Sequence, residues 1–312
     1  MKIDAQIVSY KLKKPFTISR GSRTTAEVIQ VTITQDGKVG IGECSPTGRY
    51  GETFDSVMAQ IASLEPHQFD RATLQTLLPA GAARNAIDCA LWDLASKSFP
   101  FEFDLPSTIQ TAMTVSISSA DNMAQEASSY IDQGARLIKV KLDAEDIYER
   151  LSAVRQVAPD ATLIVDANEA WSALDLHQTI HQLVPLNIAM IEQPLPAAED
   201  ERLKGLNSPI PICADESCHT QADIPSLIGL YQMVNIKLDK TGGLTGALEL
   251  ERRAREAGLE IMVGCMLGSS IAMKAALPVA ANAVLVDLDG AYLIKDDIEG
   301  GLHYQTGAIV LS

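Results

Sequence analysis

The chain has 312 residues, of which 46% are hydrophobic and 21% are charged, a composition that excludes disordered, collagen-like and low-complexity proteins. It carries 25 Lys and Arg against 40 Asp and Glu, so the formal net charge is −15. This balance argues against nucleic acid as a partner, because phosphate backbones bind to basic surfaces. The five cysteines form no CxxC pair, the amino terminus lacks the pattern of a signal peptide, and the uncharged run Ile261 to Met273 is too short to cross a bilayer. We therefore expect a reduced, cytoplasmic protein without a membrane partner.

The first hundred residues have the pattern of a small α+β domain. Polar and apolar residues alternate over Lys2–Leu12, Glu27–Thr34 is rich in β-branched residues, and a turn leads into Val39–Glu43, which together predict an antiparallel sheet. Apolar residues then recur at helical spacing, most clearly over Gly81–Lys97. Phe99–Ser107 contains two prolines and no clear period, so we expect it to link this domain to the next.

Short apolar segments follow at a nearly constant interval. From the second onward their starts are 22 to 27 residues apart, which leaves room for a strand, a helix and two loops in each unit. Eight such units predict a closed βα barrel, and a doubly wound open sheet is the alternative. The chain ends in Gly301–Ser312, which again has a strand pattern and is expected to return to the first domain. The eight predicted strands are Thr111–Ile117, Leu137–Leu142, Thr162–Ala167, Ile188–Gln193, Pro211–Ala214, Met233–Leu238, Glu260–Gly264 and Ala283–Asp289.

Two lysines lie on the second predicted strand. Lys139 and Lys141 stand in the sequence IKVKLD, and the period of two along a strand directs both side chains to the same face. An outward lysine would face the apolar inner side of the helix layer. We therefore expect both lysines to point into the barrel.

Carboxylates end the next three strands. Asp166, Glu192 and Asp215 each follow an apolar run, and in a barrel of this type the carboxyl ends of the strands carry the chemistry. Three inward carboxylates repel one another unless a cation neutralises them. All-oxygen ligands favour one hard ion per subunit, Mg²⁺ first and Mn²⁺ as its substitute. The alternative is that each acid caps the helix that follows it.

A further lysine, Lys237, ends the sixth predicted strand. If strands two and six lie opposite each other, Lys141 and Lys237 flank the space above the metal. A metal and ammonium groups stabilise the charge that forms when a carbon beside a carboxylate loses its proton. A lysine on each side can remove the proton and return one to the other face, so this pattern predicts racemisation or epimerisation.

Two other patterns resemble sites but have simpler explanations. His177 and His181 stand at i and i+4, yet no glutamate follows His177 as in an HExxH metal site, and a solvated helix face is the favoured interpretation. Gly242 and Gly243, with Gly246 nearby, open a helix after strand six without the Walker pattern. A tight turn is favoured there over an anion site.

Taken together, these motifs resemble the muconate-lactonising-enzyme subgroup of the enolase superfamily. The resemblance rests on KxK, DxN, EQP, ADES and NIKL at the strand ends, and the sequence DLDG at residues 287–290 is similar to that of the dipeptide epimerases. It extends over nearly the whole chain and is strongest to enzymes that interconvert L-Ala-D-Glu and L-Ala-L-Glu in murein peptide recycling. The further matching segments are RGSR (20–23), RYGE (49–52), LPAGAARNAIDCALWDLA (78–95), IVDANE (164–169), ICADESCHT (212–220), MVNIKLDKTGGLT (233–245) and GCML (264–267).

The resemblance implies an α+β capping domain over residues 1–100, a (β/α)7β barrel over residues 108–290, and a returning tail over residues 291–312. It also implies Mg²⁺ and assigns a role to each site residue. The implied set has Asp166, Glu192 and Asp215 on the metal, Lys141 and Lys237 as acid and base, and Lys139, Thr114, Arg23, Cys265, Met266, Asp287 and Asp289 on the substrate.

The resemblance also implies how the dipeptide is recognised. Asp287 and Asp289 would bind its free ammonium group, while Lys139 would help to hold its carboxylate on the metal. Arg23 would pair with the glutamate side chain, with Arg20 as the alternative. Loops around Arg20–Arg23 and Thr47–Glu52 would close over the substrate.

Three alternatives remain open at the level of sequence. One is o-succinylbenzoate synthase or N-succinylamino-acid racemase chemistry, against which Asp287 and Asp289 speak, since they suit a free ammonium group better than an acylated nitrogen. A second is a dipeptide epimerase with a different side-chain preference. A third is a non-catalytic ligand-binding protein. A homo-oligomer is left open, and the stretch Lys97–Ser107 is shorter than the resemblance leads us to expect.

Overall fold

The computed structural model describes residues 1–65, 69–98 and 103–311, so the first four residues of the predicted linker lie outside the described part. The capping domain begins with an antiparallel sheet of β1 (Lys2–Ile18), β2 (Gly21–Gln35) and β3 (Lys38–Cys44), in that order. Its core is filled by one face of this sheet and by three helices. The helices are α1 (Phe54–Ala62), α2 (Arg71–Leu77) and α3 (Ala82–Ser96).

Helix α3 packs directly onto β3 because two glycines leave room for it. A Cβ atom on Gly42 would lie 2.0 Å from the carbonyl oxygen of Ala86, and one on Gly40 would lie 2.1 Å from that of Ala90. The predicted sheet and the predicted helix over Gly81–Lys97 are therefore confirmed.

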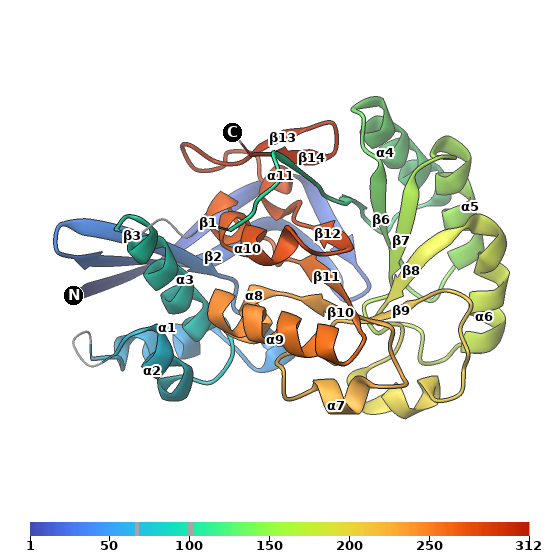
Figure 1. Ribbon diagram of the computed structural model, residues 1–312. Coiled ribbons are helices and arrows are strands. Elements are labelled where there is room, and N and C mark those ends of the chain that lie inside the picture. Colours follow the sequence, from blue (N-terminus) through green and yellow to red (C-terminus); the bar gives the residue numbers. More distant parts are fainter. Residues whose placement is uncertain (66–68, 99–102, 312) are drawn as a thin grey trace.

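The first hairpin is longer than the sequence predicted. Strands β1 and β2 continue past Leu12 and begin before Glu27, so that a paired arm extends from the sheet to the barrel (Figure 1). Most of the arm between these residues is exposed or half-buried, and its apolar contacts are limited to a small cluster that includes Phe16 and Ala26. It therefore lacks the apolar alternation by which a strand is predicted.

Eight parallel strands form the barrel, and their order follows the sequence from β5 to β12. The ring is closed by a hydrogen bond from the Ala112 amide to the Val286 carbonyl, 2.8 Å long, so the open-sheet alternative is wrong. The strands are β5 (Met113–Val115), β6 (Leu137–Lys141), β7 (Thr162–Asp166), β8 (Ile188–Glu192), β9 (Ile212–Ala214), β10 (Met233–Ile236), β11 (Glu260–Gly264) and β12 (Leu285–Asp287).

Apolar side chains fill the interior of the barrel. One layer takes a buried residue from each of the eight strand segments, which makes the interior a packed core and not a channel. Its members are Ala112, Leu137, Ile164, Met190, Cys213, Met233, Met262 and Leu285.

Helices cover the outside of the barrel (Figure 1). The helices of the barrel domain are α4 (Ala120–Asp132), α5 (Ile147–Val157), α6 (Leu176–Leu183), α7 (Ile224–Leu227), α8 (Leu238–Thr241), α9 (Leu244–Glu256), α10 (Ser270–Ala280) and α11 (Gly290–Leu293). Two 3-10 turns, at Val184–Leu186 and Ala197–Leu203, belong to the same domain, and a third, at Gly48–Tyr50, follows β3 in the capping domain. No helix in the described residues is long and apolar enough to cross a membrane.

The tail only partly follows its predicted course. Ile294 bridges Leu12 of β1, and the Lys295 amide donates to the Lys11 carbonyl at 2.8 Å, so this part does reach the capping domain. The final hairpin, β13 (His303–Gln305) and β14 (Ala308–Val310), does not. It pairs with β4 (Thr108–Gln110), the segment that leads into the barrel.

Candidate active site

The carboxyl ends of the barrel strands bring the predicted charged residues together. In the strand register Lys141 pairs with Asp166, and Asp166 pairs with Glu192, so these three residues stand side by side at one level. Lys139 and Lys141 are both buried, with 1% and 7% of their surfaces exposed, and both line the same cavity. The inward direction predicted for the two lysines is confirmed.

Lys139 lies at the centre of this charged cluster. Its Nζ is 2.7 Å from an oxygen of Glu192, 2.7 Å from one of Asp287 and 3.1 Å from one of Asp166. Burial by itself would lower the pKa of Lys139, but the three carboxylates outweigh burial and raise that pKa well above its ordinary value. Lys139 is therefore held as a fixed positive charge.

Lys141 and Lys237 approach the cavity from opposite walls. Strands β6 and β10 are separated by three strands in either direction around the ring, which places them across the barrel from each other. Lys141 Nζ donates to Asp166 at 2.5 Å, and Lys237 Nζ donates to Asp215 at 2.6 Å. Each lysine thus has its own carboxylate partner, and the two ammonium groups face a shared space.

The three strand-end carboxylates are fully buried beneath the lysines. Burial opposes their ionisation, yet Lys141 and Lys139 hold the pKa of Asp166 below its ordinary range, and Lys237 with Lys240 does the same for Asp215. Burial, followed by the nearby Asp166, raises the pKa of Glu192. Negative charge is therefore less stable on Glu192 than on Asp166 or Asp215.

The same carboxylates offer a set of oxygen atoms that suits a hard cation. Glu192 Oε2 is buried and accepts no hydrogen bond, because its contact with Lys139 has only the geometry of an ion pair. Within the described chain no three such side chains stand together as a ready cation cage, since ammonium groups lie between the carboxylates. The carboxylate oxygens fit a divalent ion, provided that the ammonium groups of the lysines move away from them.

Lys240 belongs to this cluster and was missed in the sequence. Its Nζ donates to the side chain of Asp215 at 2.6 Å, and it also contacts the backbone carbonyls of Asp215 and Asn235. The Asn235 side chain in turn donates to Glu192 at 2.7 Å. The only available signal was a second lysine three residues after Lys237, which sequence reasoning assigns to the surface.

One end of the cavity is acidic, because Asp287 and Asp289 line it. The Thr114 amide donates to Asp289 at 2.8 Å, and burial together with Asp287 raises the pKa of Asp289 to about 7. Asp287 Oδ1 is buried and accepts no hydrogen bond from the residues that the structure describes. Cys265 and Met266 line the wall beside these residues. This end can accept a positively charged group.

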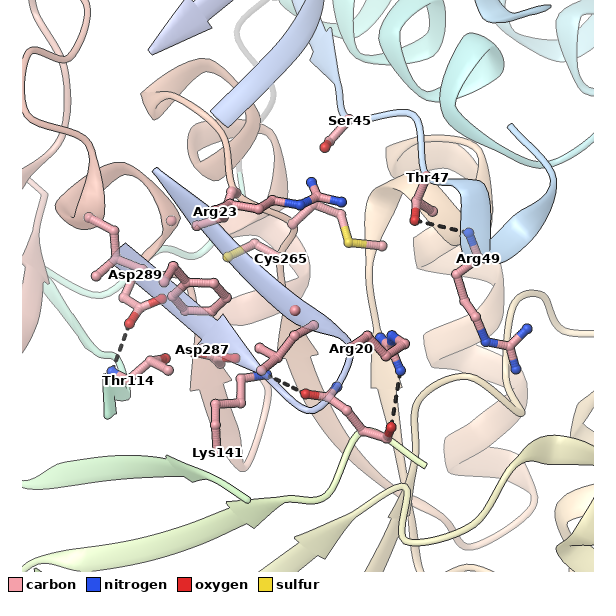
Figure 2. Close-up of a pocket in the computed structure, with 18 of the residues that line it drawn as sticks. Arg20, Arg23, Ser45, Thr47, Arg49, Thr114, Lys141, Cys265, Asp287 and Asp289 are labelled. Carbon is pink, nitrogen blue, oxygen red and sulfur yellow. Dashed lines mark hydrogen bonds between the residues drawn. The ribbon is translucent and has the colours of Figure 1, made fainter. Parts of the chain in front are cut away.

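A cavity of about 380 Å³ connects the two ends (Figure 2). Lys141, Asp287 and Asp289 reach it from the barrel, whereas Arg20 and Arg23 reach it from the hairpin arm. All the residues that we predicted to contact substrate line this single cavity. The predicted metal ligands lie below it.

The two candidate arginines of the hairpin differ in their contacts. Arg20 donates to Glu216 at 3.0 Å, to the Asn168 carbonyl at 3.1 Å and to Glu169 at 3.3 Å. The Arg23 side chain makes no hydrogen bond or ion pair within the described chain, although it lines the cavity. Of the two arginines, Arg23 is therefore the one whose side chain remains available to a bound anion.

The remaining patterns have the simpler explanations. His177 and His181 stack on an exposed face of α6, with ring centroids 4.1 Å apart. Gly242 and Gly243 form a turn whose open side is occupied by Arg84 and Asp88 of α3. The turn has no room for an anion.

Comparisons with known proteins agree with this architecture. Residues 2–101 match the family model for the mandelate racemase / muconate lactonizing enzyme N-terminal domain, and residues 122–311 match the model for the enolase C-terminal domain-like family. The L-Ala-D/L-Glu epimerase of Escherichia coli K12 is 50% identical, with 97% of each chain covered. The N-acetyl-D-glutamate racemase of a Pseudoalteromonas species is 44% identical, over 90% of this chain and 91% of the relative.

Solved structures give the same result. An enolase family member from Agrobacterium tumefaciens with homology to dipeptide epimerases, determined with sodium and L-Ala-L-Glu, has a TM-score of 0.95 and 41% identity over 99% of this chain and 97% of its own. A dipeptide epimerase of Enterococcus faecalis, determined with Mg and L-Leu-L-Tyr, has a TM-score of 0.91 and 29% identity over 99% and 96%. The chain belongs to the mandelate racemase / muconate lactonizing enzyme family of the enolase superfamily.

Proposed function

We propose that the protein epimerises dipeptides at the carbon beside the terminal carboxylate, and that it interconverts L-Ala-D-Glu and L-Ala-L-Glu. The observation that carries this proposal is the pair Lys141 and Lys237, whose ammonium groups face one cavity from opposite walls of the barrel. The 50% identical relative from Escherichia coli, an L-Ala-D/L-Glu epimerase, supports the choice of substrate.

Mg²⁺ is the cofactor that the buried carboxylates fit, with Mn²⁺ as its substitute. We propose that one ion per subunit is held by Asp166, Glu192 and Asp215, whose donors are all oxygens. They include Glu192 Oε2, which accepts no hydrogen bond from the described residues. When bound, the ion supplies a Lewis acid that stabilises negative charge on the substrate carboxylate. Lys139, fixed between Glu192 and Asp287, adds a positive charge to the same region.

The two lysines carry out the proton transfer in this proposal. The amine nitrogen of one lysine binds the α-proton as the Cα–H bond breaks, and the electron pair moves into the adjacent carboxylate group. The ammonium group of the other lysine then delivers a proton to the opposite face of the same carbon. The configuration at Cα is inverted, and each lysine ends in the protonation state from which the other began.

The two ends of the cavity orient the dipeptide. Asp287 and Asp289 suit its free ammonium group, because Asp287 Oδ1 is buried and has no hydrogen-bond partner among the described residues. Arg23 suits the glutamate carboxylate, since Arg20 is already occupied by Glu169 and Glu216. Thr114, Cys265 and Met266 complete the wall.

The remaining assignments extend this proposal to the whole chain. Residues 1–100 serve as the capping domain, residues 108–290 as the catalytic barrel, and residues 291–312 as the tail that joins them. A cytoplasmic enzyme of murein peptide recycling accords with the chosen substrate and with five cysteines that form no disulfide in the described structure.

A second candidate is the racemisation of N-acylated glutamate. It is favoured by the 44% identity to an N-acetyl-D-glutamate racemase. The same lysines and metal ligands would serve it, but an acylated nitrogen has no positive charge to offer Asp287 and Asp289. The two candidates therefore differ at the acidic end of the cavity.

Proton exchange in D2O tests the main proposal. We expect L-Ala-L-Glu, incubated with the protein and Mg²⁺, to lose the NMR signal of the glutamate α-proton and to yield L-Ala-D-Glu. Lys141→Ala and Lys237→Ala should each abolish the conversion, and a chelator should do so reversibly. The proposal fails if neither exchange nor conversion is seen across a small library of dipeptides.

A double variant separates the two candidates. Asp287→Asn with Asp289→Asn should lower kcat/KM for L-Ala-L-Glu by about 100-fold, because charge-assisted contacts are worth roughly 1.5–3 kcal/mol each. N-acetyl-glutamate, which lacks the ammonium group, should be affected much less. If the wild-type protein prefers N-acetyl-glutamate to the dipeptide, the second candidate replaces the first.

A further inference from the structure

Lys237 begins a short segment, residues 237–243, that joins β10 to α9 and contains only one helical turn. It follows the last residue of β10, and the chain then makes the single turn of α8 before Gly242 and Gly243, which both have positive φ angles of 72° and 104°. Helix α9 begins at Leu244, and Gly243 at its N-cap has no side chain to accept the free amide groups. A catalytic side chain on such a segment needs external support, because catalytic groups must be held to within about 0.5 Å.

The missing cap comes from the other domain. Asp88 of α3 accepts a hydrogen bond from the backbone amide of Thr245, in the first turn of α9, at 2.9 Å. Trp92, one turn further along α3, donates from its indole nitrogen to the Thr245 hydroxyl at 2.9 Å. Asp88 therefore does for α9 what an N-cap residue does within its own helix, but from about 157 residues away in the chain.

Arg84, one turn before Asp88 on α3, holds the other side of the segment. Its guanidinium donates to the carbonyls of Thr241 at 2.8 Å and Gly242 at 3.3 Å, which are the free carbonyls at the end of α8. Asn85 donates to Asp239 at 3.1 Å. Both ends of the segment are thus bound to one face of α3.

The fit is close enough that the glycines are required. A Cβ atom on Gly242 would lie 2.3 Å from Arg84 Nε, and one on Gly243 would lie 2.5 Å from Asp88 Cβ. The gripping side chains are themselves buried and fixed, because Gln75 donates to Asp88 at 3.0 Å and its carbonyl accepts from Arg84 at 3.1 Å. The close fit leaves no space for a side chain at either glycine.

We propose that Asp88 and Arg84 are positioning residues for Lys237, and that the capping domain thereby controls proton transfer on one face of the substrate. The inference rests on the proposed function. The hydrogen bonds of the Lys141 side chain are with Asp166 and Asn168 in the barrel, and its ammonium group lies 6.0 Å from the centroid of the Phe16 ring in β1. No hydrogen bond or ion pair joins Lys141 to α3 in the described structure. Weakening the contacts of α3 with residues 241–245 should therefore displace Lys237 and leave Lys141 in place.

Solvent exchange can be measured separately for the two faces. Lys237→Ala first identifies the diastereomer whose α-proton exchange in D2O depends on Lys237. We expect Asp88→Ala, saturated with Mg²⁺, to slow exchange of that diastereomer about tenfold or more, since a displacement of 1 Å can cost about 100-fold in rate. Exchange of the other diastereomer should stay within about twofold of wild type. Asp88→Asn, which keeps an acceptor for Thr245, should recover most of the lost rate.

A matched control comes from another cap of the same domain. Thr53 accepts from the Ser56 amide at 3.0 Å and caps α1, which supplies none of the residues that hold Asp88 or Arg84. Thr53→Ala should leave the ratio of the two exchange rates unchanged. Equal losses for both diastereomers in Asp88→Ala, or the same asymmetry in Thr53→Ala, would overturn the inference.

Backbone amide exchange tests the grip without reference to catalysis. Mass spectrometry should find faster hydrogen–deuterium exchange over residues 238–250 in Asp88→Ala, with residues 137–142 unchanged. If Asp88→Ala does not fold, Thr245→Val removes the hydroxyl that binds Trp92 and should give a smaller effect in the same direction. Unchanged amide exchange over residues 238–250 refutes the grip, whereas absence of α-proton exchange by the wild-type protein refutes only the proposed function.

Discussion

At the scale of single residues, the three arginines that line the cavity differ in whether a carboxylate of the described residues pairs with them. Arg20 and Arg49 both reach Glu169, and Arg20 reaches Glu216 as well, so their charges are already compensated. Arg23 lines the cavity without such a partner in the described residues. A substrate carboxylate would therefore gain most from Arg23.

Replacing Arg23 should change the side-chain preference of the enzyme. We expect Arg23→Leu to lower kcat/KM for L-Ala-L-Glu by about 10- to 100-fold, because a hydrogen bond to a charged group contributes roughly 1.5–3 kcal/mol. The value for L-Ala-L-Leu should change little or rise. Steady-state kinetics with both dipeptides measure this, and an equal loss for the two would show that Arg23 does not recognise the side chain.

Lys240 marks the limit of sequence interpretation at this scale. The acids and lysines at strand ends were predictable because the barrel sets their direction by the period of two along each strand. Lys240 lies beyond the strand, in the one-turn helix α8, where no such rule applies. Its burial beside Asp215 follows only from how that turn folds back over the barrel.

At the scale of elements, several hydrogen bonds and ion pairs attach the hairpin arm of β1 and β2 to the barrel. Lys14 pairs with Glu126 and donates to Tyr130 at 2.8 Å, both on α4. At the tip, Arg20 binds residues after β7 and β9. Arg20 also lines the cavity, so the contacts at the tip hold the arm against the site.

Weakening the attachment at the tip should release the arm. We expect Glu169→Gln to raise KM several-fold with a smaller effect on kcat, because half-exposed ion pairs contribute roughly 0.2–1 kcal/mol each. Trypsin should cut after Arg20 or Arg23 faster than in wild type. Glu199→Gln is the control, since Glu199 pairs with Arg202 on the barrel surface, away from the arm. Equal cleavage rates in the two variants would contradict this role for Glu169.

At the scale of the whole molecule, buried acids join the two domains. Asp239 of the barrel accepts from the Ser45 amide at 2.8 Å and from Asn85 at 3.1 Å, both in the capping domain. Burial, aided by the nearby carboxylates of Glu52 and Glu43, raises the pKa of Asp239 from 3.8 to about 7. The interface therefore holds the protonated form of Asp239 more readily than the unfolded chain does.

This shift predicts how stability depends on pH. Between pH 4 and pH 7 the folded protein retains a proton on Asp239 that the unfolded chain has lost, so the contribution of Asp239 to the free energy of unfolding decreases as pH rises through that range. The slope approaches about 1.4 kcal/mol per pH unit. Asp239→Asn should flatten the curve measured by denaturant unfolding from pH 4 to pH 8. Asp175→Asn, at the exposed N-cap of α6, should not, and parallel curves for Asp239→Asn and wild type would refute the assignment.

The sequence by itself determined the barrel, the capping sheet and the charged residues of the strand ends. These features follow from short-range periodicity and from the rule that parallel strands present their carboxyl ends together. Only the tertiary structure decided the features that depend on contacts across long stretches of chain. Arg20 is joined to Glu216, Asp88 caps α9, and the final hairpin pairs with β4 and not with the capping sheet. No local pattern encodes such pairs, because their partners are chosen by the packing of one domain on the other.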